Sequence, residues 1–194
     1  RYNARNKIQL FRISSDLIPF GSSEVNPLSW WELFQEQLEE IGDFAKKNQI
    51  RLSMHPGQYT VLNSPDEQVV QRAVEDLMYH CRVLDAMKLD ASNKIILHIG
   101  GVYNNREQAI QRFERNYLRL PEQVKRRLVI ENDDRSYSAD EVLQLAKQLK
   151  IPMIFDVFHH EVLPSKKEWN LNRWMAEINQ TWTALDGRMK SHYS

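Results

Sequence analysis

The segment Lys94-Ile-Ile-Leu-His98 is a short apolar run that ends in a residue able to bind a metal ion. The pattern recurs along the chain, at Ile50-Arg-Leu-Ser-Met-His55, Leu128-Val-Ile-Glu131, Pro152-Met-Ile-Phe-Asp156 and, more weakly, Met189-Lys-Ser-His192. Short apolar runs of this kind are typical of parallel strands that are covered by helices. Metal-binding side chains at the ends of successive strands indicate one rim of a β/α barrel.

Stretches with helical spacing separate these strands. Capping-box patterns at Ser29-Trp-Trp-Glu32, Ser64-Pro-Asp-Glu67 and Ser138-Ala-Asp-Glu141 predict three helix starts. The second of these helices is expected to run to about Met87, and further helices are predicted near 106–118 and 172–185. The first predicted helix presents an apolar face made of Trp30, Leu33, Phe34, Leu38, Ile41, Phe44 and Ala45. The tryptophans Trp30, Trp174 and Trp182 are assigned to such apolar helix faces.

Together with a first strand at Ile8–Ser14, this alternation predicts an α/β fold of the TIM-barrel type. A doubly wound open sheet is the alternative, but no Gly-rich phosphate loop supports it. The 194 residues suit a single β/α-barrel catalytic domain over 1–194. A complete barrel needs roughly 250 residues, so we expect a partial barrel of about six strands. Because the chain begins without Met and stops in a strand-like run, we expect the middle of a longer protein that lacks its N- and C-terminal parts.

Composition narrows the protein class. The single cysteine, Cys81, excludes an internal disulfide and fits the reducing cytoplasm. No apolar stretch approaches the ~18 residues of a membrane span, and no signal-peptide pattern is present. The 26 basic and 26 acidic residues balance, which argues against a uniformly basic nucleic-acid binder but leaves local patches open. We expect a monomer that does not engage membranes.

The histidines cluster at strand ends in a way that chance explains poorly. Of the six, only His80 lies in the middle of a predicted helix, where a structural role is expected. The residues at or just after strand ends are His55, His98, His159, His160 and His192, together with Glu131 and Asp156. A mixed set of imidazole and carboxylate suits Mn²⁺, Zn²⁺ or Fe²⁺ better than Ca²⁺, and it lacks the thiolates of a structural zinc site. With more than four candidate ligands, we expect two or three divalent metal ions, as in enzymes that cleave phosphodiesters.

The loop His55-Pro-Gly-Gln-Tyr59 carries a second signal. A Pro-Gly turn explains why the strand stops there. It does not explain the presentation of an amide, Gln58, and an aromatic ring, Tyr59, beside a metal ligand. That pair suits contact with a nucleic-acid base, with Tyr59 stacking or wedging and Gln58 bonding an exposed edge.

Several motifs together resemble the UV damage endonuclease family. They are His55-Pro-Gly-Gln-Tyr59, Leu97-His-Ile-Gly-Gly101, Ile130-Glu-Asn-Asp133, Phe155-Asp-Val-Phe-His-His160 and Lys190-Ser-His192, with Phe11-Arg-Ile-Ser-Ser15 near the start. The resemblance spans nearly the whole chain. It implies a TIM barrel related to endonuclease IV and a DNA repair endonuclease whose partner is damaged double-stranded DNA. The implied reaction is a manganese-dependent nick immediately 5′ to cyclobutane dimers and 6-4 photoproducts, leaving a 3′-hydroxyl and a 5′-phosphate.

The same resemblance implies roles for individual residues. The metal ligands become His55, His98, Glu131, Asp156, His159 and His192. Gln58 and Tyr59 become the pair that probes the lesion, and Glu131 and Lys190 the catalytic residues. Lys190 matches a lysine that can be carboxylated in this family. One departure concerns Ser23, which stands where the family typically places a histidine ligand, so one metal position is incomplete.

The basic residues fall into two groups. Seven basic residues within 106–127 are interpreted as a solvated outer helix, whereas Arg135, Lys166 and Lys167 are better placed to reach DNA.

A metal-dependent sugar isomerase or epimerase on a similar barrel is one alternative function, although a sugar pocket has little need of a protruding Gln-Tyr pair. A catalytically inactive fragment is the other, and it is motivated by Ser23 and by the missing N- and C-terminal parts.

Overall fold

A computed structural model describes residues 1–193 and shows a curved, six-stranded parallel sheet. The strands follow one another in chain order, as β1 (Leu10–Ile13), β2 (Arg51–Met54), β3 (Lys94–His98), β4 (Leu128–Glu131), β5 (Met153–Asp156) and β6 (Ser191–His192). Within residues 1–193, β1 and β6 pair with one neighbour each, so the sheet forms part of a barrel. The prediction of a partial α/β barrel with about six strands is confirmed.

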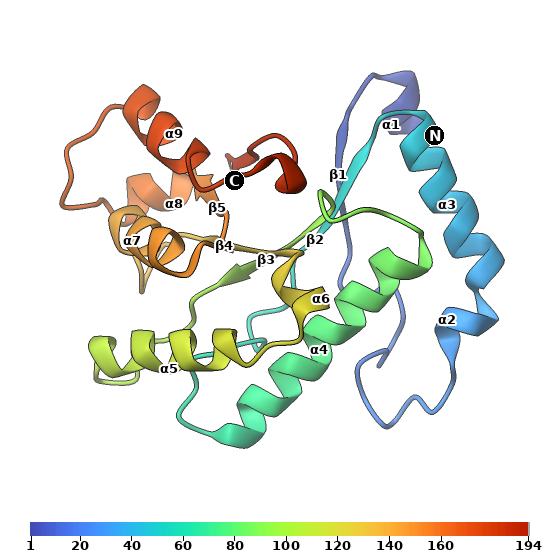
Figure 1. The fold of residues 1–194 in the computed structure, drawn as a ribbon, viewed down its shortest axis with the longest axis horizontal. Coiled ribbons are helices and arrows are strands. Elements are labelled where there is room, and N and C mark those ends of the chain that lie inside the picture. The colour runs from blue at the N-terminus through green and yellow to red at the C-terminus, as the bar shows by residue number, and fades with distance from the viewer. Residues whose placement is uncertain (194) are drawn as a thin grey trace.

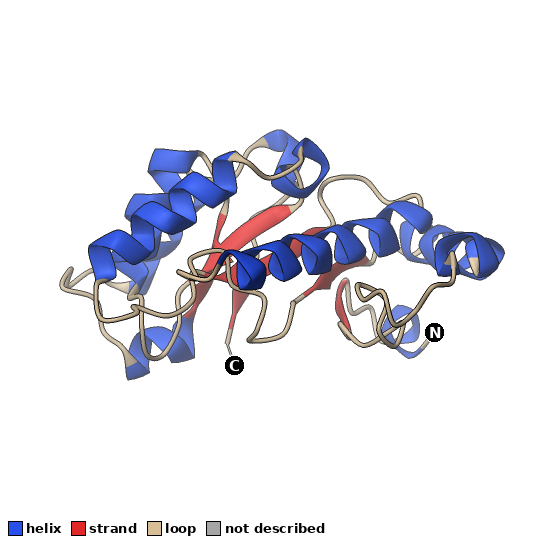
Figure 2. Cartoon of the chain, turned by 90° about the horizontal axis from the view of Figure 1, so that it is seen from below, coloured by secondary structure: helices blue, strands red, loops and turns tan. Residues whose placement is uncertain are grey.

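Helices surround the outer face of this sheet (Figure 1). They are α1 (Tyr2–Arg5), α2 (Trp30–Leu33), α3 (Gln35–Lys47), α4 (Glu67–Ala86), α5 (Arg106–Leu118), α6 (Glu122–Lys125), α7 (Ala139–Leu149), α8 (Val157–Val162) and α9 (Leu171–Asn179), followed by the 3-10 turn η1 (Ala184–Asp186). Figure 2 shows the strands in the middle of the molecule, partly hidden behind a long helix that crosses in front of them. No helix within residues 1–193 is long and apolar enough to cross a membrane.

Strand alternation divides the apolar residues between two sides of the sheet. Leu97 and Ile130 point outward, into the large core between sheet and helices. Ile96, Val129 and Ile154 point the other way and form a second cluster, against which Trp182 packs. The assignment of Trp182 to a helix face is therefore wrong, because α9 already ends at Asn179 and the following chain brings the indole to the concave side. There its Nε1 donates to the Met153 carbonyl at 2.7 Å.

The capping patterns had mixed outcomes. The box at Ser138 and Glu141 is confirmed, with both reciprocal contacts present. The box at Ser64 is wrong, because α4 begins later with Asp66 as its N-cap, whose carboxylate accepts from Gln68 N at 2.8 Å. At Ser29 the predicted helix start is confirmed, because Ser29 is the N-cap of α2, but the side-chain bonds of the box are not formed.

The predicted apolar face of the first helix is only partly buried. Trp30, Leu38 and Ala45 join the core, but Ile41 and Phe44 remain 47% and 37% exposed. The helix breaks at residue 34 into α2 and α3, which interrupts the face. Figure 1 shows α3 at the β1 end of the sheet, at the edge of the fold. The outward side of α3 therefore stays exposed.

Candidate metal centre

Five side chains from successive strand ends meet on the concave side of the sheet. Parallel pairing sets His98 opposite Glu131, and Asp156 opposite His192. His55 follows β2 directly and joins them. Two groups have ligand atoms within 4.8 Å of one another: His55 with His98 and Glu131, and Glu131 with Asp156 and His192. The structure thus brings together five of the six predicted ligands, with Glu131 common to both groups.

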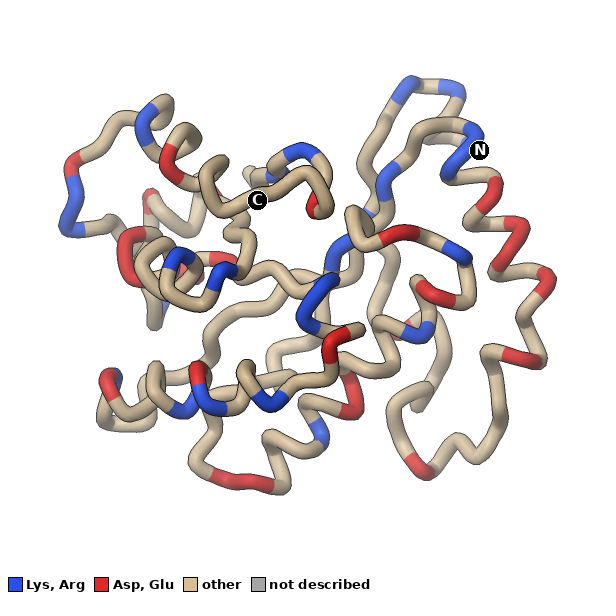
Figure 3. The backbone as a smooth tube through the Cα atoms, in the orientation of Figure 1, with Lys and Arg blue, Asp and Glu red and all other residues tan. Residues whose placement is uncertain are grey.

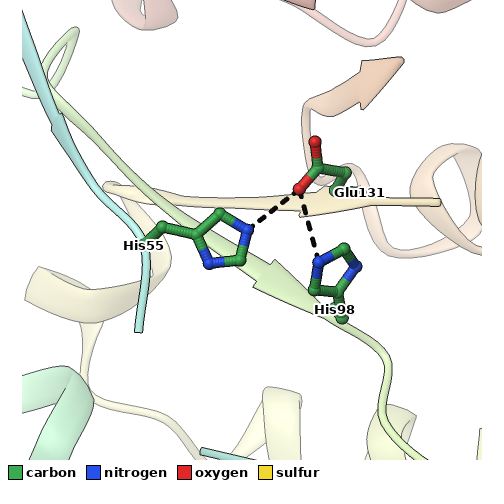
Figure 4. A group of neighbouring side chains, drawn as sticks. All are labelled: His55, His98 and Glu131. Carbon is green, nitrogen blue, oxygen red and sulfur yellow. Dashed lines mark hydrogen bonds and ion pairs between the residues drawn. The ribbon is translucent and has the colours of Figure 1, made fainter. Parts of the chain in front are cut away.

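Glu131 is the centre of this cluster, and its side chain is 1% exposed. One carboxylate oxygen lies 3.0 Å from His55 Nε2 and 3.6 Å from His98 Nε2, and Figure 4 shows both rings turned toward it. The other oxygen lies 2.5 Å from His192 Nδ1. Burial by itself raises the pKa of Glu131, but hydrogen bonds from His192 and His55 outweigh it and hold the pKa well below its usual range. The carboxylate is therefore ionised and shared between two sets of imidazoles.

Backbone carbonyls orient two of the histidine rings. His55 Nδ1 lies 3.1 Å from the Pro56 carbonyl, and His159 Nδ1 lies 2.9 Å from the Asn132 carbonyl. For His159, donation from Nδ1 to that carbonyl leaves Nε2 as the metal-binding atom. For His98, burial lowers the pKa, with Glu131 partly opposing it. The neutral imidazole that a metal requires is thereby favoured.

Asn132 holds the ends of β4 and β5 together, a role that sequence reasoning missed. Its side chain donates to the Asp156 carbonyl and accepts from Asp156 N, both at 2.9 Å, and it is fully buried. Asp156 in turn caps α8 by accepting from His159 N at 2.9 Å. Because β5 ends at Asp156 and α8 begins at once, the His159 ring lies beside the cluster, 5.6 Å from the His98 ring. The only sequence signal for Asn132 was an amide directly after a strand-end Glu.

Lys190 lies one residue layer below these ligands. Its amine donates to Ser53 Oγ at 2.6 Å, and the residue is 9% exposed. Burial lowers the pKa of Lys190 to about 8, and the neighbouring Arg51 guanidinium acts in the same direction. Lys190 and His192 share the concave face, because alternate residues of an extended segment point to the same side, but Lys190 makes its hydrogen bond to β2 rather than to Glu131.

Gln58 and Tyr59 project from the rim beside His55. The turn that carries them is closed by Thr60 N donating to the Gly57 carbonyl at 3.0 Å. Tyr59 is 83% exposed, so its ring is free to meet a ligand. The turn separates a cavity of about 880 Å³ from another of about 1020 Å³. Ser23 lines the first cavity together with His55, and Arg135 lines the second.

The basic residues outside the rim are partly structural. Figure 3 shows basic and acidic residues mixed along most helices, with mainly acidic ones on α3. Arg127, within the stretch interpreted as a solvated helix, is instead 1% exposed and pairs with Asp85 at 2.5 Å. Lys166 and Lys167 are exposed in the loop between α8 and α9.

The donor set fits divalent metal ions of borderline hardness. It combines imidazole nitrogens with carboxylates that are almost fully buried, as Mn²⁺, Fe²⁺ or Zn²⁺ sites do. A thiolate is absent from it, because Cys81 lies in α4 with its Sγ directed to the Gln123 carbonyl. Two groups that share one carboxylate are the arrangement expected of a multinuclear site.

Comparison with known proteins identifies the family. The sequence model of a family described as UV-endonuclease UvdE matches residues 1–194. The chain belongs to this family. It is 48% identical over 194 residues to the UV DNA damage endonuclease of Clostridium perfringens (strain 13 / Type A), covering all of this chain and 47% of that protein. It is 42% identical over 200 residues to the UV-damage endonuclease of Schizosaccharomyces pombe (strain 972 / ATCC 24843), covering all of this chain and 33% of that protein.

A solved member of the UvdE family has the same fold. The crystal structure of SacUVDE superposes with a TM-score of 0.88 at 40% identity, over 93% of this chain and 61% of that one. Endonuclease IV from Thermus thermophilus and the D-psicose 3-epimerase from Clostridium cellulolyticum share only the fold, with TM-scores of 0.64 and 0.66 at 12% and 16% identity. The chain spans between a third and three fifths of the length of these UV-endonuclease relatives.

Proposed function

We propose that this chain forms the catalytic domain of a metal-dependent endonuclease that nicks DNA immediately 5′ to UV photoproducts, leaving a 3′-hydroxyl and a 5′-phosphate. The shared carboxylate of Glu131, between His55 and His98 on one side and His192 on the other, is the observation that carries the proposal. Family membership and the names of its relatives supply the substrate class.

In this proposal the metal ligands are His55, His98, Glu131, Asp156, His159 and His192. When bound, two or three divalent ions, with Mn²⁺ as the proposed species, place positive charge on the phosphate and lower the pKa of water to near neutrality. Burial and hydrogen bonding already fix the ligand rings, so little reorganisation is needed on metal binding.

The chain's own residues orient the reacting groups. Glu131 keeps His55, His98 and His192 turned toward one point, and Asn132 fixes Asp156 and His159 relative to β4. We propose that Lys190 is a catalytic residue. It lies in the layer beneath the ligands, where its amine donates to Ser53, and we propose it as the position open to carboxylation. The site lies on the concave side of the sheet, and the carboxylates of Glu131 and Asp156 are almost fully buried.

Gln58 and Tyr59 are proposed to probe the lesion. Tyr59 stands almost fully exposed on a closed turn between two cavities large enough for nucleotides. An aromatic ring in this position can enter a base stack, at a cost of a few kcal/mol that is smallest where stacking is already disturbed by damage. Selectivity for photoproducts follows from that difference.

The decisive experiment is a nicking assay on UV-irradiated plasmid with the full-length protein and Mn²⁺. We expect nicking that EDTA abolishes and that His98→Ala, Glu131→Ala and Asp156→Ala remove together with bound manganese. Full activity in these variants would contradict the site assignment. Gln58→Ala with Tyr59→Ala should retain manganese but lose the preference for irradiated over untreated plasmid.

Two rival functions are separated by the same preparation. Thermal stabilisation by a ketose, without nicking of irradiated plasmid, would favour a sugar isomerase or epimerase. Absence of bound metal in the wild-type protein would favour a catalytically inactive chain, and Ser23→His would then be expected to restore metal binding if the substituted ligand position is the cause.

A further inference from the structure

One arginine is common to the two cavities beside the Tyr59 turn. Arg72 lies in α4 and lines both, whereas Arg12 lines only the first and Arg135 only the second. The other residues lining both cavities belong to the turn and its approach, namely His55, Gly57, Tyr59 and Thr60. Arg72 therefore forms part of the wall that divides the cavities.

The charge of Arg72 is not neutralised within the described chain. Its natural partner on the helix would be Asp76, one turn further on. That carboxylate is already engaged, because Asp76 Oδ2 accepts from Thr60 Oγ1 at 2.6 Å and lies 3.7 Å from His80 Nδ1. Among residues 1–193, Arg72 makes no hydrogen bond or ion pair, and its side chain is exposed.

The same hydrogen bond fixes the geometry around Arg72. By joining Thr60 to Asp76, it ties the end of the Tyr59 turn to α4, the helix that carries Arg72. The turn that carries Tyr59 and the helix that carries Arg72 are thus joined directly. A DNA strand whose neighbouring nucleotides occupy the two cavities must carry its connecting phosphate across this dividing wall.

We propose that Arg72 binds the backbone phosphate of the damaged strand where the strand crosses the Tyr59 turn. This rests on the proposed function, because it takes DNA as the ligand. The planar guanidinium offers paired N–H donors that match two phosphate oxygens, and its charge is available because Arg72 forms no ion pair within residues 1–193. The contact positions the strand and carries no sequence information.

The test compares Arg72→Gln with Arg72→Lys and with a matched control, Arg119→Gln. Arg119 is also exposed, but it lies after α5 and lines neither cavity. The full-length, manganese-loaded proteins are titrated with a duplex that carries one photoproduct and an uncleavable methylphosphonate at the linkage 5′ to it. Fluorescence anisotropy at several salt concentrations gives the affinity and its salt dependence.

We expect Arg72→Gln to weaken binding by about tenfold and to reduce the slope of log affinity against log salt by about 0.9, the share of one phosphate. Arg72→Lys should restore the slope, and Arg119→Gln should leave both quantities unchanged. Wild-type slope in Arg72→Gln, or an equal loss in Arg119→Gln, would overturn the proposal. Nicking of irradiated plasmid is measured in parallel: wild-type binding without nicking refutes the endonuclease and leaves the Arg72 contact standing, while no binding by wild type refutes both.

Discussion

Gly100 is the position at the rim where a single methyl group should do the most damage. It lies two residues after the metal ligand His98 and has a φ of +107°, a backbone conformation that L side chains rarely adopt. A Cβ built there would stand 2.3 Å from Asn63 Oδ1 and 3.2 Å from Val61 Cγ1. Gly100→Ala therefore combines backbone strain with a collision.

The expected loss of stability in Gly100→Ala follows from the backbone strain and from the displacement of Asn63. Holding alanine at this φ costs about 1–3 kcal/mol. Relieving the collision displaces Asn63, which is fully buried and donates to the Gly101 carbonyl at 2.7 Å. Loss of that bond in a buried site costs roughly another 1–3 kcal/mol. We expect the free energy of unfolding to fall by about 2–6 kcal/mol, which is a large part of the roughly 5–15 kcal/mol typical of a domain.

A matched control lies on the neighbouring loop. Gly57 has no heavy atom within 4 Å of its built Cβ and no positive φ. Gly57→Ala should leave the free energy of unfolding unchanged within about 0.5 kcal/mol or raise it slightly, because alanine restricts the unfolded chain. The comparison separates the local geometry of Gly100 from a general effect of replacing rim glycines.

The assay is urea unfolding followed by tryptophan fluorescence, with bound manganese measured on the same preparations. Gly100→Ala should unfold at much lower urea and bind manganese more weakly, since His98 lies two residues before it at the end of β3. A fall of less than about 1 kcal/mol in Gly100→Ala, or a similar fall in Gly57→Ala, would refute this account of the β3 loop.

Three further perturbations address the site, the rim and the core. Glu131→Gln should reduce manganese affinity by more than about 100-fold, because both ligand groups share this carboxylate, whereas the exposed Glu122→Gln should bind normally; equal manganese content by elemental analysis would contradict the shared role. Thr60→Val should lower the free energy of unfolding by about 1–2 kcal/mol by leaving Asp76 without its bond, and Thr60→Ser should restore it in the same urea titration. Burial raises the pKa of Cys81 from 9.0 to about 12, so its contribution to stability is complete below pH 9 and is lost as the pH rises toward 12. The stability of wild type relative to Cys81→Ala should therefore decline above pH 9 by up to about 1.4 kcal/mol per pH unit, and a constant difference in unfolding free energy would show that the thiol is not shielded.

Much of the architecture could be predicted because its signals are local. The six strands were recognised from short apolar runs, and α4, α5 and α7 from helical spacing. Where local signals competed, the sequence misled. Ser64 and Asp66 both suit an N-cap, and in the structure α4 begins at Glu67 with Asp66 as its N-cap. The apolar stripe of α3 predicts burial, but burial also needs a neighbour, and α3 lies at the β1 end of the sheet.

Interactions between residues far apart in the sequence could not be predicted, because they depend on how whole elements pack. The bond from Thr60 to Asp76 joins a rim turn to a helix, and the freedom of Arg72 follows from it. Neither residue type nor spacing distinguishes Arg72 from the other arginines of the chain. Its position in the wall between two cavities depends on how α4 packs against β3, which is set by the whole sheet.

The sequence by itself determined the class of fold and the candidate ligands, because strand–helix alternation and strand-end side chains are properties of short segments. Tertiary structure alone decided that Glu131 is shared by two ligand groups, that His159 lies beside them and that Lys190 lies in the layer beneath. The physical reason is register: parallel pairing of five strand ends sets which side chains share a level, and no segment contains that information on its own.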